Sequence, residues 1–125
     1  MLEELVDRLD LERSEVTAAL HRLHDDDVIA LQPGTDLIWL AHPFSALDAP
    51  FVVTSGGRTW DAICIWDAFG ILAILEKDGS IVARCPDCAA GLHLEVTDGT
   101  VDPSSEMVVH FGVPAARWYE DIGHT

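Results

Sequence analysis

Positive charge is scarce in this sequence. Seven Lys and Arg residues, including a single lysine (Lys77), stand against 22 Asp and Glu among 125 residues, for a formal net charge of −15. Affinity for nucleic-acid phosphate and for anionic membranes depends on cationic side chains, so both partners are disfavoured. Long apolar runs are also lacking, because the longest, 62–75, is interrupted by Asp67 and is too short to cross a bilayer. The acidic, amphipathic first residues do not resemble a signal peptide, so we expect a cytoplasmic protein.

Cysteine is the second scarce residue, with three in the chain, at positions 64, 85 and 88. An odd number cannot pair completely within the chain, and in a reducing compartment such residues are thiols, metal ligands or catalytic groups. Disorder is excluded as well, because 49% of the residues are hydrophobic. A chain of this size can bury a real core without cross-links.

Residues 1–47 are predicted to form helix, helix and hairpin. Apolar residues at 2, 5, 6 and 9 have helical spacing, and Asp10 or Ser14 is expected to cap a second helix. Two apolar runs, 28–31 and 37–41, are separated by a turn sequence. This order is winged-helix-like, but the acidic HRLHDDD segment favours a structural or docking module over a DNA-binding one.

Residues 48–125 are predicted to form the rest of an α+β fold, a small mixed or antiparallel sheet packed on a buried helix. The unbroken run 62–75 is too long for one strand and predicts that helix, despite Gly70. A closing helix is expected from Pro114 to Trp118. The four tryptophans are expected in the core and in pocket walls. Strands are expected at 51–54, 80–84, 92–97 and 106–113.

Cys64 and Asp67 are the first candidate site. At positions i and i+3 of a helix they share a face. The first turn of a helix is expected to lower the pKa of the Cys64 thiol and to favour thiolate. Asp67 interrupts an apolar stretch, so its carboxyl is expected either to be paired or to have a raised pKa that suits a proton donor. The spacing is also compatible with a buried structural Cys and an Asp bonded to a nearby loop.

Cys85 and Cys88 form a lone CxxC, in the sequence CPDC. A structural zinc ion needs four ligands. His93 and His110 are the candidates for the two ligands that the cysteines do not supply. A thioredoxin-like role needs the motif at the start of a helix, whereas a turn between two strands is expected here. A plain turn with two thiols is therefore favoured over a metal or redox site.

Four segments resemble the alkylmercury lyases (organomercurial lyases), over about residues 40–125. The most specific part is the C-x-x-D helix followed by the C-x-x-C turn, and the closing W-x-E-D-I-x-x-T agrees. The segments are AHPFSALDAPFVV, TWDAICIWDAFGILAIL, ARCPDCAAGLHLEV and MVVHFGVPAARWYEDIGHT.

The resemblance implies protonolysis of a carbon–mercury bond, with Cys64 as the catalytic thiolate that binds mercury and Asp67 as the acid that protonates carbon. Thiolate is the ligand that a soft metal selects. The implied products are a hydrocarbon and Hg(II), which passes to small thiols or to a mercuric reductase. Mercury is substrate and product, and no organic cofactor is implied.

The family's second catalytic cysteine is expected just after W-x-E-D-I-x-x-T, whereas this sequence ends at Thr125 with no cysteine after Cys88. The chain is therefore expected to be a truncated form, a short natural relative, or a member with different chemistry. Three alternatives stay open. They are a non-catalytic protein that binds a thiophilic metal through Cys64, Cys85 and Cys88, a family scaffold reused for another reaction at Cys64, and a metal-sensing winged-helix regulator.

Overall fold

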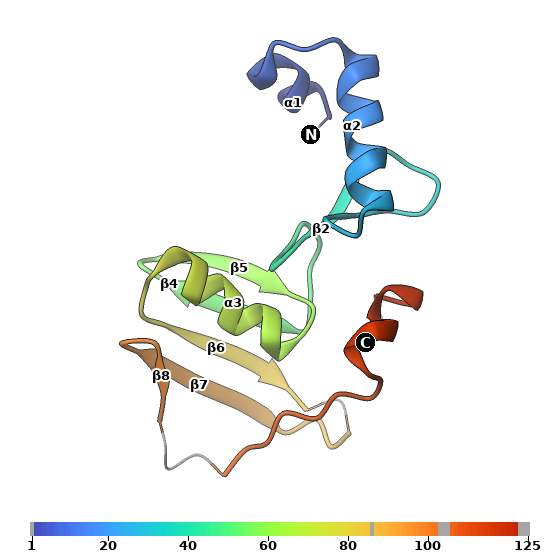
Figure 1. Ribbon diagram of the computed structural model, residues 1–125. Helices are drawn as coiled ribbons and strands as arrows, with labels where there is room; N and C mark the ends of the chain where they lie inside the picture. Colours follow the sequence, from blue (N-terminus) through green and yellow to red (C-terminus); the bar gives the residue numbers. More distant parts are fainter. Residues whose placement is uncertain (1, 86, 103–105, 123–125) are drawn as a thin grey trace. The chain divides into compact units, whose positions relative to one another are not determined.

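A computed structural model describes residues 2–85, 87–102 and 106–122. The chain divides into two compact units, an N-terminal unit (Met1–His42) and a C-terminal unit (Pro43–Thr125). This division falls a few residues before the end of the predicted first segment, 1–47. The α+β class expected from the sequence is confirmed, since helices and antiparallel strands follow one another along the chain (Figure 1).

The N-terminal unit contains α1 (Leu2–Leu9), α2 (Arg13–Asp25) and an antiparallel hairpin of β1 (Ala30–Leu31) and β2 (Ile38–Ala41). This is the expected order of elements, and its winged-helix interpretation stays a prediction. A small apolar cluster holds the unit together, consisting of Leu2, Val16, Leu20, Ile29 and Leu31.

The cap of α2 differs from the expectation. Glu12 is the N-cap residue, and its backbone N–H donates to the Glu15 carboxylate at 3.0 Å. Such a reciprocal arrangement with a Glu three residues later is a capping box, which satisfies amide groups that the helix leaves unpaired. Asp10 instead adopts a left-handed backbone with φ of 52° beyond the end of α1. The prediction of Asp10 or Ser14 as the cap was wrong, because Glu12 and Glu15 satisfy the helix start together.

The C-terminal unit is built on an antiparallel sheet in the order β3-β5-β4-β6-β7-β8 (Figure 1). Helix α3 (Ile65–Leu75) lies across one face and contacts β4 and β5. The predicted helix and the strands near 51–54, 80–84 and 92–97 are confirmed. The helix is buried on one face, at Ala68, Ile71 and Leu72, whereas Trp66 and Ile74 are exposed. The strand bounds are Phe44–Ser45 for β3, Phe51–Ser55 for β4, Arg58–Ala62 for β5, Gly79–Arg84 for β6, Gly91–Thr97 for β7 and Thr100–Val101 for β8.

The core of this unit lies between α3 and the sheet. It consists of Val53, Ala62, Ala68, Ile71, Leu72, Ile81 and Val96. Packing explains the glycine at position 70 within the helix, because a Cβ there would lie only 3.2 Å from the Cβ of Pro43. Gly79 is tighter still, because a Cβ would meet the Thr54 carbonyl oxygen and would lie 2.8 Å from a Leu72 methyl carbon. Glycine therefore allows α3 to approach Pro43 at position 70, and allows the start of β6 to lie against Thr54 and Leu72 at position 79.

The segment 106–113 differs from the prediction. It was expected to be a strand, but it is irregular in the structure. Its apolar side chains are exposed, to 88% at Val108 and 48% at Val109. A strand needs a neighbour for its backbone hydrogen bonds, and none of the described ladders includes this segment, although β8 pairs with only Val96 and Thr97 of β7. The closing helix expected from Pro114 is present as a 3₁₀ helix, η1 (Ala115–Glu120), preceded by Pro114.

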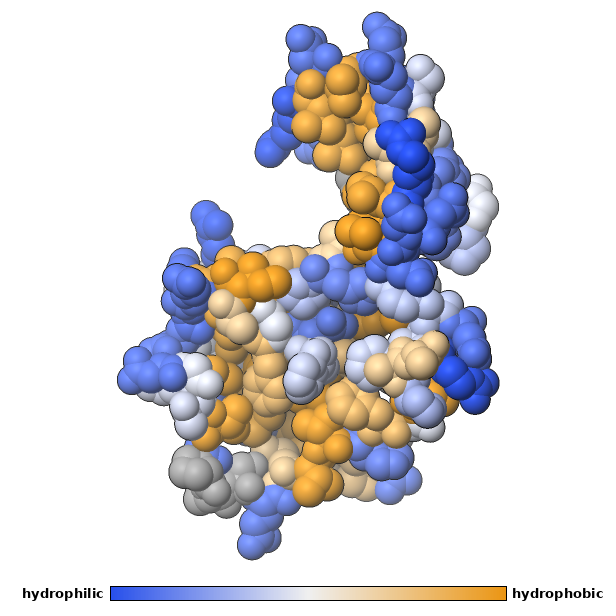
Figure 2. Space-filling model, viewed as in Figure 1, coloured by the Kyte–Doolittle hydropathy of each residue, from blue (hydrophilic) through white to orange (hydrophobic). Residues whose placement is uncertain are grey.

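On the face shown in Figure 2, hydrophobic surface is interrupted by hydrophilic side chains in both units. Exposed apolar residues occur in each, among them Leu9 and Val28 in the first and Trp66 and Val108 in the second. Among the described residues, no helix has the length and apolar character needed to span a membrane.

Candidate functional site: the thiol–carboxyl pair at the start of α3

Cys64 is the N-cap residue of α3, with an extended backbone (φ −141°, ψ 169°). Its Sγ accepts a hydrogen bond from the backbone N–H of Asp67 at 3.4 Å, as a polar side chain does at an N-cap. In return, the Cys64 thiol donates to Oδ2 of Asp67, also at 3.4 Å. The two candidate residues are therefore in direct contact, and the expected pairing of Asp67 is made by Cys64 itself.

The protonation of Cys64 is opposite to the sequence-based expectation. Burial raises the pKa of the Cys64 thiol from an ordinary 9.0 to about 11. The backbone N–H of Asp67 lowers the pKa, but the negative charge of the Asp67 carboxylate and its hydrogen bond to the thiol raise it again. The expectation of a thiolate was wrong, because desolvation outweighs the favourable helix terminus. At neutral pH the site holds a thiol that donates to its neighbouring carboxyl group.

Cys85 and Cys88 lie in the turn between β6 and β7, as expected. Cys85 closes this turn through its backbone, whose N–H donates to the Ala90 carbonyl at 2.8 Å and whose carbonyl accepts from Ala89 at 2.9 Å. Hydrogen bonds from the backbone N–H groups of Cys88 and Asp87, and from the Cys88 side chain, lower the pKa of the Cys85 thiol. Cys85 is thus the thiol whose surroundings favour the thiolate.

The three cysteines are all free thiols. Within the described ranges, no group of three or more His, Cys, Asp and Glu side chains is placed to hold one metal ion. The predicted metal site at Cys64, Cys85 and Cys88, and the zinc alternative, therefore stay predictions. His93, which was considered for zinc, lies with Nε2 2.8 Å from Oε1 of Glu95.

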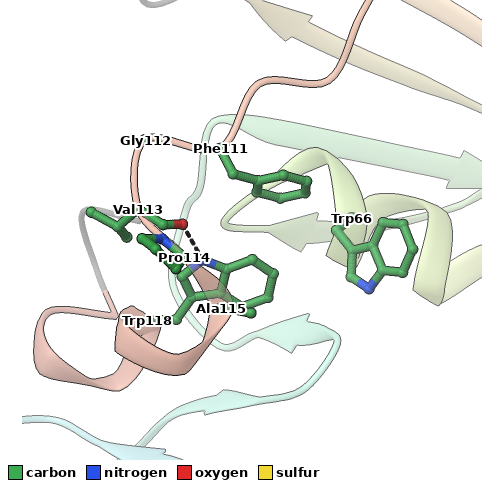
Figure 3. A pocket seen from close by; sticks show the side chains of 7 residues that line it. All are labelled: Trp66, Phe111, Gly112, Val113, Pro114, Ala115 and Trp118. Carbon is green, nitrogen blue, oxygen red and sulfur yellow. Dashed lines mark hydrogen bonds between the residues drawn. The ribbon is translucent and has the colours of Figure 1, made fainter.

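An apolar hollow of about 500 Å³ lies beside the N-terminal part of α3 (Figure 3). Only Trp66 among its lining residues comes from α3, and its side chain is 64% exposed. The Phe111 and Trp118 rings lie 5.2 Å apart on another wall, and Trp118 Nε1 donates to the Val113 carbonyl at 3.0 Å. Cys64 and Asp67 do not line the hollow, but Trp66 stands between them in the chain. Phe111 and Val113 were missed as lining residues because the run 106–113 was interpreted as a strand.

Fold and site together define an α+β domain in which a thiol and a carboxyl group contact each other at the start of a buried helix. Such a pair can bind a soft metal through sulfur and move a proton at the same place. Residues 44–123 match the family model of the alkylmercury lyases (MerB). The chain belongs to the alkylmercury lyase family.

A solved structure with a similar fold is the mercury-bound form of MerB2, with a TM-score of 0.65 and 20% sequence identity. The similarity covers 82% of this chain and 49% of that chain, so the present sequence spans about half the length of MerB2. No curated protein matched the sequence.

Proposed function

We propose that this chain cleaves the carbon–mercury bond of organomercurials by protonolysis, with Cys64 as the mercury ligand and Asp67 as the proton donor. The observation that carries the proposal is the pair of 3.4 Å contacts between Cys64 Sγ and Asp67. Membership of the alkylmercury lyase family and the fold shared with mercury-bound MerB2 support it.

The raised pKa of Cys64 shapes the first step. A thiol must lose its proton to bind a metal ion. As the sulfur–mercury bond of R–Hg–S forms, the proton leaves Cys64 and the former ligand of mercury departs as an anion. The Asp67 carboxylate already accepts the hydrogen bond of this thiol, so it is placed to take the proton. Asp67 is then a neutral acid beside the bound substrate.

The second step returns that proton. Asp67 delivers it to the carbon attached to mercury, and the electron pair of the carbon–mercury bond forms the new carbon–hydrogen bond. The hydrocarbon leaves, Hg(II) stays on Cys64, and Asp67 is again a carboxylate. Small thiols, or a mercuric reductase, would then take the ion from Cys64. Thiolates suit this transfer because Hg(II) is soft.

The organic group of the substrate needs an apolar surface. The hollow beside Trp66, with the Phe111 and Trp118 rings on its other wall, supplies one next to the thiol-bearing end of α3 (Figure 3). Aromatic rings favour the burial of an aryl or alkyl group and offer ring-to-ring contacts. This supports aryl- and alkylmercury compounds as the substrate class.

The test is release of benzene from phenylmercury by the purified chain in excess small thiol. The expected result is turnover that Cys64→Ser abolishes together with stoichiometric binding of the organomercurial. The circular dichroism spectrum of the variant checks that the fold is retained. Unchanged binding in Cys64→Ser would refute the assignment of Cys64. Mercury retained without any hydrocarbon released would favour the non-catalytic metal-binding alternative.

A further inference from the structure

The turn between β6 and β7 brings two thiols together away from the Cys64–Asp67 pair. Cys88 is exposed and Cys85 is partly so. The Cys88 side chain makes a hydrogen bond to the Cys85 sulfur, which also accepts from the backbone N–H groups of Asp87 and Cys88. The CxxC spacing and this hydrogen bond bring the two sulfurs together in one turn.

Two backbone hydrogen bonds hold this turn in shape. Cys85 N–H donates to the Ala90 carbonyl at 2.8 Å, and Ala89 N–H donates to the Cys85 carbonyl at 2.9 Å. The Arg84 guanidinium donates to the Ala89 carbonyl at 3.3 Å. Strands β6 and β7 pair directly up to Arg84 and Gly91, so the turn projects from a fixed ladder. A pair of thiols held in this way loses little conformational freedom when it binds a common ligand.

The number of ligands selects the kind of ion. Among the described residues, no third His, Cys, Asp or Glu side chain joins these two thiols to surround a metal. Zinc in a structural site takes four ligands in a tetrahedron. A soft cation that binds two thiolate ligands, such as Hg(II), fits a site with two thiols.

We propose that Cys85 and Cys88 form a second, separate binding site for a soft two-coordinate cation of the Hg(II) type. On binding, the two sulfur–metal bonds form, any proton still bound to either sulfur passes to solvent, and no oxidation state changes. Binding itself is independent of lyase activity. A role as the receiver of the Hg(II) that Cys64 releases rests on the proposed function.

The experiment uses the full chain with Cys64→Ser, so that the α3 thiol takes no part, and inorganic Hg(II) as the probe. Titration under reducing conditions, in competition with a monothiol, is expected to show one ion bound per chain. Protection of both remaining thiols against alkylation should accompany it. Adding Cys88→Ser should weaken the binding by about 10²-fold or more. The chain then supplies one thiolate, and the second must come from a separate molecule in solution.

Three outcomes would overturn the proposal. They are equal affinity with and without Cys88, two ions bound independently at the two thiols, and Zn(II) held as tightly as Hg(II). Cys85→Ser in the Cys64→Ser background gives a second, independent removal of one ligand. The titration uses inorganic Hg(II) and no organomercurial. Its failure would refute the dithiol site alone, whereas a failed lyase assay would refute the proposed function alone.

Discussion

The N-terminus of α3 and the turn between β6 and β7 each hold a thiol, and the two regions act on that thiol in opposite directions. Burial raises the pKa of Cys64 to about 11, whereas backbone N–H groups and the Cys88 side chain lower the pKa of Cys85. Cys64 also receives N–H donors, from Asp67 and Trp66. The difference lies in which cause is largest: desolvation dominates at Cys64, whereas at Cys85 the hydrogen-bond donors outweigh desolvation and the negative charge of Asp87.

This contrast separates two kinds of thiol chemistry in one small unit. The Cys85–Cys88 pair is accessible and favours an anionic sulfur, which suits capture of a soft cation. Cys64 keeps its proton beside Asp67, which suits a reaction that needs a proton at the same place. A thiol that were already ionised at α3 would bind mercury readily but would bring no proton with it.

The largest effect is expected for Asp67→Asn, which should move two properties of the α3 site in opposite directions. Turnover of phenylmercury should fall by about 10²- to 10⁴-fold, because the proton donor is lost. Alkylation of Cys64 at fixed pH should become several-fold faster, since one pKa unit is tenfold in thiolate and the carboxylate contributes to the raised pKa. Hydrocarbon release and peptide-resolved alkylation measure the two.

The matched control is Glu76→Gln, which removes an acid at the opposite end of the same helix, where Glu76 is the C-cap residue. It should change neither quantity appreciably. If Asp67→Asn lowered both turnover and alkylation, Asp67 would be a structural support of the helix start and not the acid.

The second prediction concerns the pH dependence of Cys64. With a pKa of about 11 instead of 9.0, its thiolate fraction at pH 8 is roughly a hundredfold lower, so its alkylation should be slower by about that factor. The native state retains the proton up to a higher pH than the unfolded chain does. Stability should therefore decrease as the pH rises from about 9 to about 11, and Cys64→Ser should remove that part of the decrease.

Peptide-resolved alkylation between pH 7 and 11, together with denaturant unfolding across the same range, checks this prediction. Cys85 in the same samples is the internal reference and should react faster than Cys64 throughout the lower part of the range. Equal rates at pH 8 would abolish the contrast between the two regions.

The helix α3 and the sheet it covers were predictable because their signals are local. An unbroken apolar run of helical length, bounded by strands with turn sequences between them, permits few other arrangements. The segment 106–113 was not predictable in this way. Its β-forming composition is the same whether or not the chain finds a strand to pair with, and none of the described ladders includes this segment.

At the candidate site, spacing correctly predicted that Cys64 and Asp67 would meet, because positions i and i+3 at a helix start are neighbours. The pKa of the thiol was predicted in the wrong direction. A helix terminus is visible in sequence, but burial of Cys64 depends on the packing of distant segments around it. The hollow beside Trp66 was also hidden, since its other wall comes from residues some forty-five positions further along the chain.

The smallest effect is expected in the β6–β7 turn, and it tests the cause of the lowered pKa at Cys85. Cys88→Ala removes the side-chain donor to Cys85, whereas Cys88→Ser leaves a hydroxyl that can still donate. Alkylation of Cys85 at neutral pH should therefore slow by a few-fold in the alanine variant and by less in the serine variant. The change stays modest because the backbone N–H groups of Cys88 and Asp87 remain in both. An unchanged rate in both variants would show that the backbone alone sets the pKa of Cys85, and that the Cys88 side chain does not contact the Cys85 sulfur as the dithiol site requires.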